Sequence, residues 1–128
     1  MTFRFGEIVG RYRLVVSPEL LEFIERAFVE PAALEQRDAI RAEALHEAAG
    51  SELEVTSDGH VISRSHEQQF YRIALAAPAG LCAPRGDLEY EELCFEKGPS
   101  APVSLRLVDK DTVRATQPGK PVTEFRRL

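Results

Sequence analysis

The 128-residue chain has no tryptophan, one methionine, two cysteines and three histidines, and no long apolar run interrupts its polar residues. A membrane-spanning helix needs roughly 18 consecutive apolar residues, so none is expected. Residues 1–10 lack a basic segment followed by an apolar one, and no secretory leader is predicted from them. The expected location is therefore cytoplasmic.

The sequence also has few of the residues from which metal and redox sites are built. Cys82 and Cys94 form no CxxC pair and neither adjoins a histidine, so we expect free thiols in a reducing compartment. His60 and His66 would need a third ligand to hold a metal, which leaves Glu52, Glu54 or His46 as candidates. Exposed loop histidines are the favoured interpretation, and no metal or cofactor is predicted.

Catalytic motifs are absent as well. The chain contains no GxSxG nucleophile turn and no glycine-rich phosphate loop, and the adjacent acids Glu91 and Glu92 would face opposite ways on a strand. No catalytic residue is predicted, and a binding protein is favoured over an enzyme. Lys and Arg number 16 against 21 Asp and Glu, and this net charge of -5 argues against nucleic acid or an anionic membrane as the main partner.

The length of the chain predicts a single domain over residues 1–128. Within it, the spacing of the apolar residues changes at Gly50 from a helical to a strand period. Residues 3–16 alternate like an opening strand. Ser17-Pro18-Glu19 is typical of a helix start, and Glu30-Pro31 interrupts that helix before a second one over residues 32–49. The apolar stripe of the second helix is thin, which predicts a lid or flank. Its charged residues are predicted to be solvated: Glu35, Arg37, Asp38, Arg41, Glu43 and Glu47.

After Gly50 the alternation has period 2, and short turn signals separate the segments. Strands are predicted at 51–56, 60–65, 69–76, 88–96, 102–108, 112–117 and 121–128, with a bulge at Glu91-Glu92. Sequential strands with tight turns form an antiparallel meander, and about eight of them tend to close into a barrel. The predicted fold is mainly β, with two helices inserted between the first and second strands.

The opening residues Gly10, Tyr12, Leu14 and Ser17, followed by the amphipathic LLEFI segment, resemble the N-terminal signature of the fatty-acid-binding protein family. The broader lipocalin-like (calycin) barrels share the glycine-x-aromatic opening and an arginine near the C-terminus, which Arg126 or Arg127 could match. The insert at 17–50 is longer than that family's and leaves room for fewer strands. The resemblance implies a barrel with a helical lid over a cavity for a lipid-like ligand.

Three functions remain open from the sequence. The first is a carrier of a lipid-like or acidic hydrophobic small molecule, with this ligand-binding set: Tyr12, Leu14, Tyr71, Arg72, Phe125 and Arg126. An inward Arg72 would pair with a carboxylate or phosphate, whereas an outward Arg72 would lay its stem over Phe70. The second is a cavity-type cyclase or isomerase, with Glu91 or Tyr12 as catalyst. The third is a protein-binding or inhibitor module with a packed core, and homo-oligomerisation is left open.

Overall fold

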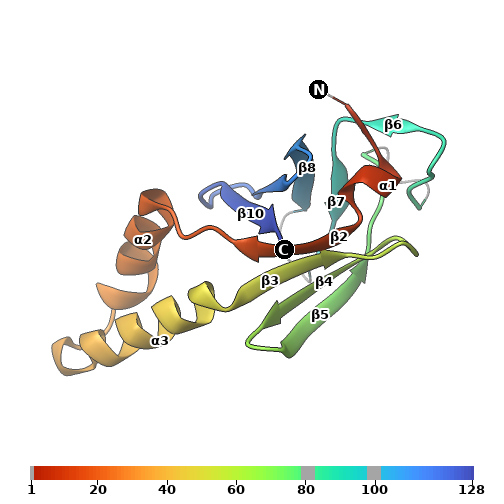
Figure 1. Cartoon of the computed structure of the whole chain (residues 1–128). Coiled ribbons are helices and arrows are strands. Elements are labelled where there is room, and N and C mark those ends of the chain that lie inside the picture. The colour runs from red at the N-terminus through yellow and green to blue at the C-terminus, as the bar shows by residue number, and fades with distance from the viewer. Residues whose placement is uncertain (1, 79–82, 98–101) are drawn as a thin grey trace.

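A computed structural model describes residues 2–78, 83–97 and 102–128 of the chain (Figure 1). Its main element is an eight-stranded antiparallel sheet with the strand order β5-β4-β3-β2-β10-β9-β8-β7. The strands are β2 (Gly10–Leu14), β3 (Ser51–Val55), β4 (His60–Ser65), β5 (Gln68–Ala74), β7 (Leu93–Phe95), β8 (Val103–Asp109), β9 (Thr112–Thr116) and β10 (Thr123–Arg127). The predicted fold class is confirmed: a mainly β protein with a helical insert.

The sheet curls until its two outer strands nearly meet. Ala76, just beyond β5, and Cys94 of β7 exchange two backbone hydrogen bonds, of 2.8 and 2.9 Å. Closure of this kind covers backbone groups that would otherwise be exposed at a sheet edge. The predicted barrel is therefore present, although it is held at this seam by an isolated bridge rather than by a full ladder.

One end of the barrel is covered by a segment that the sequence pattern did not resolve. The predicted strand over residues 3–16 is divided into β1 (Phe3–Arg4), helix α1 (Phe5–Ile8) and β2. A helical turn brings both Phe5 and Ile8 into the core, and the Glu7 carboxylate accepts a 2.9 Å hydrogen bond from the Arg4 amide. Apolar residues three apart satisfy a helical turn, so the strand prediction was wrong for residues 5–8.

The predicted bulge at Glu91-Glu92 is a break between two strands instead. Strand β6 (Glu89–Tyr90) pairs with β1 in a separate two-stranded sheet, and the chain joins the barrel only at Leu93. Tyr90 and Leu93 are both buried, so the two intervening glutamates carry the chain from one sheet to the other.

The barrel interior next to α1 is filled with side chains. Its hydrophobic core consists of Phe3, Phe5, Ile8, Tyr12, Leu53, Val55, Val61, Leu75, Tyr90, Leu93, Phe95, Leu105, Leu107 and Val113. Tyr71, Ile73 and Phe125 are partly buried and pack against this cluster. Three of the six side chains that were expected to bind ligand, Tyr12, Tyr71 and Phe125, therefore belong to this core or pack against it.

The helical insert projects from the opposite end of the barrel (Figure 1). It comprises α2 (Pro18–Ile24), a π-helical turn η1 (Glu25–Val29), a 3-10 turn η2 (Leu34–Gln36) and α3 (Arg37–Ala49). The predicted helix start is confirmed, because Pro18 opens α2 and the Ser17 hydroxyl accepts a 3.2 Å hydrogen bond from the Leu20 amide. No helix in the described part of the chain is long and apolar enough to cross a bilayer.

Two arginines hold the insert together as a hairpin. Arg41 of α3 forms a two-pronged ion pair with Glu25, and Arg37 donates to the carbonyl oxygens of Glu30 at 2.8 Å and Ala32 at 3.2 Å. The hydrogen bond and charge of Arg41 lower the pKa of Glu25. None of the side chains of α3 is buried, which confirms that this helix is a flank of the fold.

Candidate functional site

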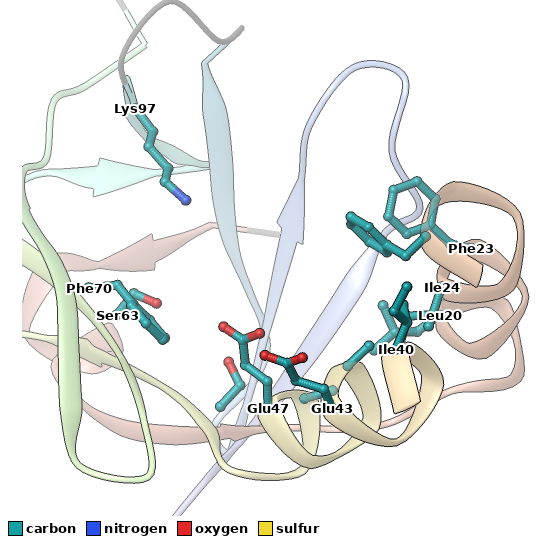
Figure 2. Close-up of a pocket in the computed structure, with 13 residues that line it drawn as sticks. Leu20, Phe23, Ile24, Ile40, Glu43, Glu47, Ser63, Phe70 and Lys97 are labelled. Atoms are coloured by element: carbon teal, nitrogen blue, oxygen red, sulfur yellow. The ribbon is translucent and has the colours of Figure 1, made fainter. Parts of the chain in front are cut away.

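The helical hairpin and the neighbouring part of the barrel leave a space between them. A cavity of about 430 Å³ lies there, bounded by α2, η1, α3 and the ends of several strands (Figure 2). Its lining consists of Leu20, Phe23, Ile24, Phe28, Ile40, Glu43, Ala44, Glu47, Ala48, Ser51, Ser63, Phe70 and Lys97. We name this space the lid cavity.

The first wall of the lid cavity is apolar and comes from α2 and η1. Helical spacing places Leu20, Phe23 and Ile24 on one face, and Ile24 is buried. The rings of Phe23 and Phe28 meet edge to face, with 6.1 Å between their centroids. Phe28 lines the lid cavity and nevertheless remains 53% exposed.

The second wall is one stripe of α3. Ile40, Ala44 and Ala48 recur on this stripe at helical spacing, and Glu43 and Glu47 lie between them. Both carboxylates point into the space between α3 and the barrel (Figure 2). These two glutamates were predicted to belong to a solvated charged face, and both are exposed. They also border the lid cavity, because their spacing places them beside Ala44 and Ala48.

The third wall belongs to the barrel and depends on a β-bulge. Ser63 pairs with Tyr71 and Arg64 pairs with Gln69, so Phe70 is an extra residue without a partner in β4. The bulge allows Phe70 to line the lid cavity, where it is 49% exposed. Regular alternation would have placed Phe70 on the same outward face as Arg72. Simple alternation in the sequence therefore does not predict that Phe70 lines the lid cavity.

Lys97 enters the lid cavity from the end of β7 (Figure 2). Its ammonium lies 4.8 Å from the centroid of the Tyr71 ring, which in turn packs on Phe95 at 5.9 Å. Burial raises the pKa of Tyr71, while a hydrogen bond with the Ser63 side chain acts in the opposite direction. The phenol is therefore neutral at physiological pH, and its ring face attracts the lysine cation.

A second, smaller cavity of about 140 Å³ adjoins the first beneath α2. Leu20 and Phe23 line both spaces. The far walls of the second cavity come from Val103, Ala115, Thr116, Gln117, Lys120, Pro121 and Thr123. Two side chains of α2 thus form the partition between the cavities.

None of the six residues predicted to bind ligand lines the lid cavity. Arg72 is exposed and its guanidinium pairs with Asp58 at 2.8 Å. Arg126 is likewise exposed on β10. Both arginines therefore point outward, which is the second of the two orientations considered for Arg72.

The four other predicted residues are buried or half-buried in the strands of the barrel. Tyr12 is fully buried, and its hydroxyl donates a 2.7 Å hydrogen bond to the Ile8 carbonyl. Leu14 and Phe125 are partners across β2 and β10, and both are half-buried. Tyr71 alone approaches the lid cavity, as the ring beneath Lys97.

The C-terminal arginine that contacts the opening aromatic residue is Arg127. Its guanidinium lies over the Tyr12 ring and donates to the carbonyl oxygens of Glu7 at 2.8 Å and Val9 at 2.9 Å. A further 3.0 Å hydrogen bond reaches the Lys110 carbonyl. Arg127 therefore ties α1 and the turn before β9 to the strand pair β2–β10.

His60 and His66, which were weighed as metal ligands and expected instead to be exposed loop residues, do not contact each other through any described interaction. His66 instead stacks on His46 with 4.0 Å between ring centroids, and its Nε2 lies 2.7 Å from the His46 carbonyl oxygen. His60 lies beside Asp58, with 3.3 Å between Nδ1 and Oδ1. No group of three metal-ligating side chains occurs within residues 2–78, 83–97 and 102–128.

Cys94 is a free, half-buried thiol, and burial, with a smaller effect from the nearby Glu92 charge, raises its pKa. Cys82 lies outside the described residues, so its state stays a prediction. Comparisons of the chain with protein-family models, with curated proteins and with solved structures found no significant match.

Proposed function

We propose that the protein binds an apolar or amphiphilic small molecule in the lid cavity. The observation that carries the proposal is that two half-exposed phenylalanines, Phe28 and Phe70, face one concave space from opposite walls. Its volume of about 430 Å³ lies within the range of small-molecule sites. A ligand between these rings would remove apolar surface from water, which stabilises a complex in proportion to the buried area.

The way in which the hairpin is attached supports the same proposal. The Ser65 hydroxyl donates a 2.8 Å hydrogen bond to the Glu47 carbonyl, and the His66 amide donates to the Gly50 carbonyl at 3.3 Å. These contacts fix the carboxyl end of α3 to the turn between β4 and β5. The opposite tip of the hairpin projects away from the barrel (Figure 1), so the distance between the walls can adjust to a ligand.

The contact between Arg127 and Tyr12 supports the resemblance to lipocalin-like barrels, because it joins the glycine-x-aromatic opening to the C-terminal arginine. On this proposal the arginine has a structural role, and ligand binding takes place at the other end of the barrel. The proposal thus retains a carrier with a helical lid, and it places the ligand beneath that lid and outside the packed core.

A cavity-filling variant tests the proposal. Ala44→Trp places an indole in the lid cavity, whereas Ala42→Trp places the same group on the exposed, opposite side of α3. Titration with a neutral solvatochromic dye should give at least about a tenfold weaker affinity for Ala44→Trp, a loss of roughly 1.4 kcal/mol. The Ala42→Trp control should bind like the wild type. Equal dye binding by both variants, with unchanged circular dichroism, would refute a site in the lid cavity.

A further inference from the structure

We infer that the protein forms a two-fold dimer, in which the tip of each helical hairpin binds a groove on the outer face of the other copy's barrel. The groove has a volume of about 560 Å³ and shares no lining residue with the lid cavity. Val15, Pro121 and Val122 form its apolar part, and Ser17 and Glu19 place it at the base of α2. The remaining lining residues, Arg114 and Glu124, pair at 2.9 Å. We name this space the basal groove.

The basal groove opens onto a basic surface of the barrel. Residues two apart on a strand, and partners across strands, share one face of a sheet. The outward charged residues of β2, β9 and β10 are therefore Arg11, Arg13, Arg114, Arg126 and Glu124, and all four arginines are exposed. Arg13 and Arg126 lie directly opposite each other, and so do Arg114 and Arg106 of β8. Like charges in this position destabilise a sheet, so a partner that supplies carboxylates would stabilise this face.

The carboxylates of the same chain compensate this charge only in part. The buried Glu52 lies 2.9 Å from Arg11 and 4.0 Å from Arg13, so one carboxylate serves two arginines. Arg126 forms no ion pair with any of the residues that the structure describes. The surface therefore keeps an excess of positive charge for an acidic partner.

The hairpin of a second copy supplies the opposite charge. Residues 17–50 contain eight acidic residues against three arginines, whereas the rest of the chain has 13 acidic and 13 basic residues. The net charge of -5 therefore comes entirely from this insert. The barrel and the hairpin thus differ in charge in the way that two complementary surfaces do.

The tip of the hairpin also matches the groove in its apolar part. Leu34 is 77% exposed, more than any other large apolar side chain in the described part of the chain. Glu30, Glu35 and Asp38 lie within four positions of it and are all exposed. An apolar side chain flanked by carboxylates complements an apolar groove that opens onto arginines.

The position of the basal groove makes the contact reciprocal. The groove lies at the base of the hairpin, whereas the tip projects away from the barrel (Figure 1). Helix α3 has 13 residues and spans about 20 Å, so the tip lies far from the groove of its own chain. Two hairpins that lie side by side in opposite directions bring each tip to the base of the other. Both contacts then form at once, which closes the assembly as an isologous dimer.

Sedimentation equilibrium from about 10 to about 500 µM tests the inference. The wild type should pass from monomer to dimer with no larger species, and raising the ionic strength should lower the dimer fraction because exposed charges are screened. Leu34→Ser should weaken dimerisation at least about tenfold. Its exposure means that the fold does not depend on this side chain. Leu88→Ser changes an exposed leucine outside the hairpin and the groove, and it should dimerise like the wild type.

A charge exchange assigns the contact to the tip and the groove. Glu35→Arg and Arg114→Glu should each weaken dimerisation at least about tenfold, because each variant brings like charges together in both contacts. An equimolar mixture of the two variants should recover the dimer, since both contacts of the mixed dimer again join opposite charges. Circular dichroism of each variant verifies the fold, because Arg114→Glu also loses the pair with Glu124.

Three results would overturn the inference. The first is a wild type that stays monomeric at about 500 µM, which would leave the basal groove to an acidic segment of another protein. The second is a mass that rises beyond that of a dimer, since a reciprocal contact cannot extend further. The third is a mixture of the two folded charge variants that dimerises no better than either variant alone.

Discussion

The guanidinium of Arg127 lies over the ring of Tyr12, with 4.8 Å between its central carbon and the ring centroid. The two residues are partners in adjacent strands, since Arg127 of β10 pairs with Tyr12 of β2. Both also bind α1 and the residue that follows it, Tyr12 through the Ile8 carbonyl and Arg127 through those of Glu7 and Val9. This one pair therefore connects the middle of the sheet to the helix that covers the end of the barrel.

The first prediction concerns the hydrogen bonds of Arg127. Arg127→Lys keeps the charge but cannot reach three carbonyl oxygens with one planar group, so the free energy of unfolding should fall by about 1–3 kcal/mol. Arg126→Lys changes the exposed neighbour on the same strand and should stay within about 0.5 kcal/mol of the wild type. Urea denaturation followed by circular dichroism measures both. A similar loss in the two variants would contradict the role given to Arg127.

The second prediction concerns Gly10, which faces the same guanidinium. Gly10 has a φ of +151°, and a Cβ there would overlap Nη1 of Arg127. Gly10→Ala should destabilise the protein by more than about 1 kcal/mol. The double variant Gly10→Ala/Arg127→Ala should lose less than the sum of the two single losses, because the overlap disappears. Gly6→Ala is the matched control, since a Cβ at Gly6 meets no atom within 4 Å.

The third prediction is a pH dependence. Burial raises the pKa of Tyr12 from 10.0 to about 12, against the opposing effect of the Arg127 charge. The folded state therefore holds this proton more tightly than the unfolded state, and its contribution to stability is complete below about pH 10 and decreases as the pH rises toward about 12. The Tyr12→Phe variant has no hydroxyl proton at this position, so its free energy of unfolding lacks this pH-dependent contribution.

At neutral pH, Tyr12→Phe should be less stable than the wild type by about 1–3 kcal/mol, because the buried Ile8 carbonyl loses its hydrogen-bond donor. The difference between the two proteins should narrow between pH 10 and pH 12. Urea denaturation at a series of alkaline pH values measures it. A difference that stays constant or widens over this range would show that Tyr12 does not retain its proton in the folded protein.

The fourth prediction concerns the helix that partitions the two cavities. Ser17→Ala removes the side-chain acceptor at the start of α2 and should cost about 1 kcal/mol of helix stability, whereas Ser17→Asp should retain the cap. Because α2 carries Leu20 and Phe23, fraying of this helix should also weaken dye binding. Hydrogen exchange at the Leu20 and Leu21 amides reports the fraying directly. Unchanged exchange in Ser17→Ala would rule out a contribution of this cap.

The parts of the fold that could be predicted depend on neighbours in the sequence. Ser17 and Pro18 set the start of α2 through local hydrogen bonding and a fixed φ, and alternation after Gly50 is a property of each strand by itself. The residues between Phe3 and Gly10 satisfy both a strand and a helical pattern. Packing against distant residues such as Tyr90 and Leu93 decides between the two patterns, and the sequence does not display those contacts.

The candidate site was harder to predict, because it depends on which side of the sheet each strand residue faces and on a β-bulge. Successive strand residues face opposite sides, so Tyr71 and Arg72 cannot both face inward, and neither can Phe125 and Arg126. In β10 the inward arginine is Arg127, which shares the face of Phe125. The bulge at Phe70 and the position of α3 follow from contacts between distant segments, and no local pattern in the sequence reports them.

The strand order has a consequence for how the molecule is made. Strands β2 and β10 are adjacent at the centre of the sheet, although Leu14 and Thr123 lie more than 100 positions apart in the sequence. During synthesis on the ribosome, the residues of β2 to β5 emerge long before those of β10. The apolar side of these strands stays exposed to solvent until the other four strands have been synthesised. Chaperone binding to the nascent chain is therefore expected to be strongest in this interval, and to end when Phe125 and Arg127 leave the exit tunnel.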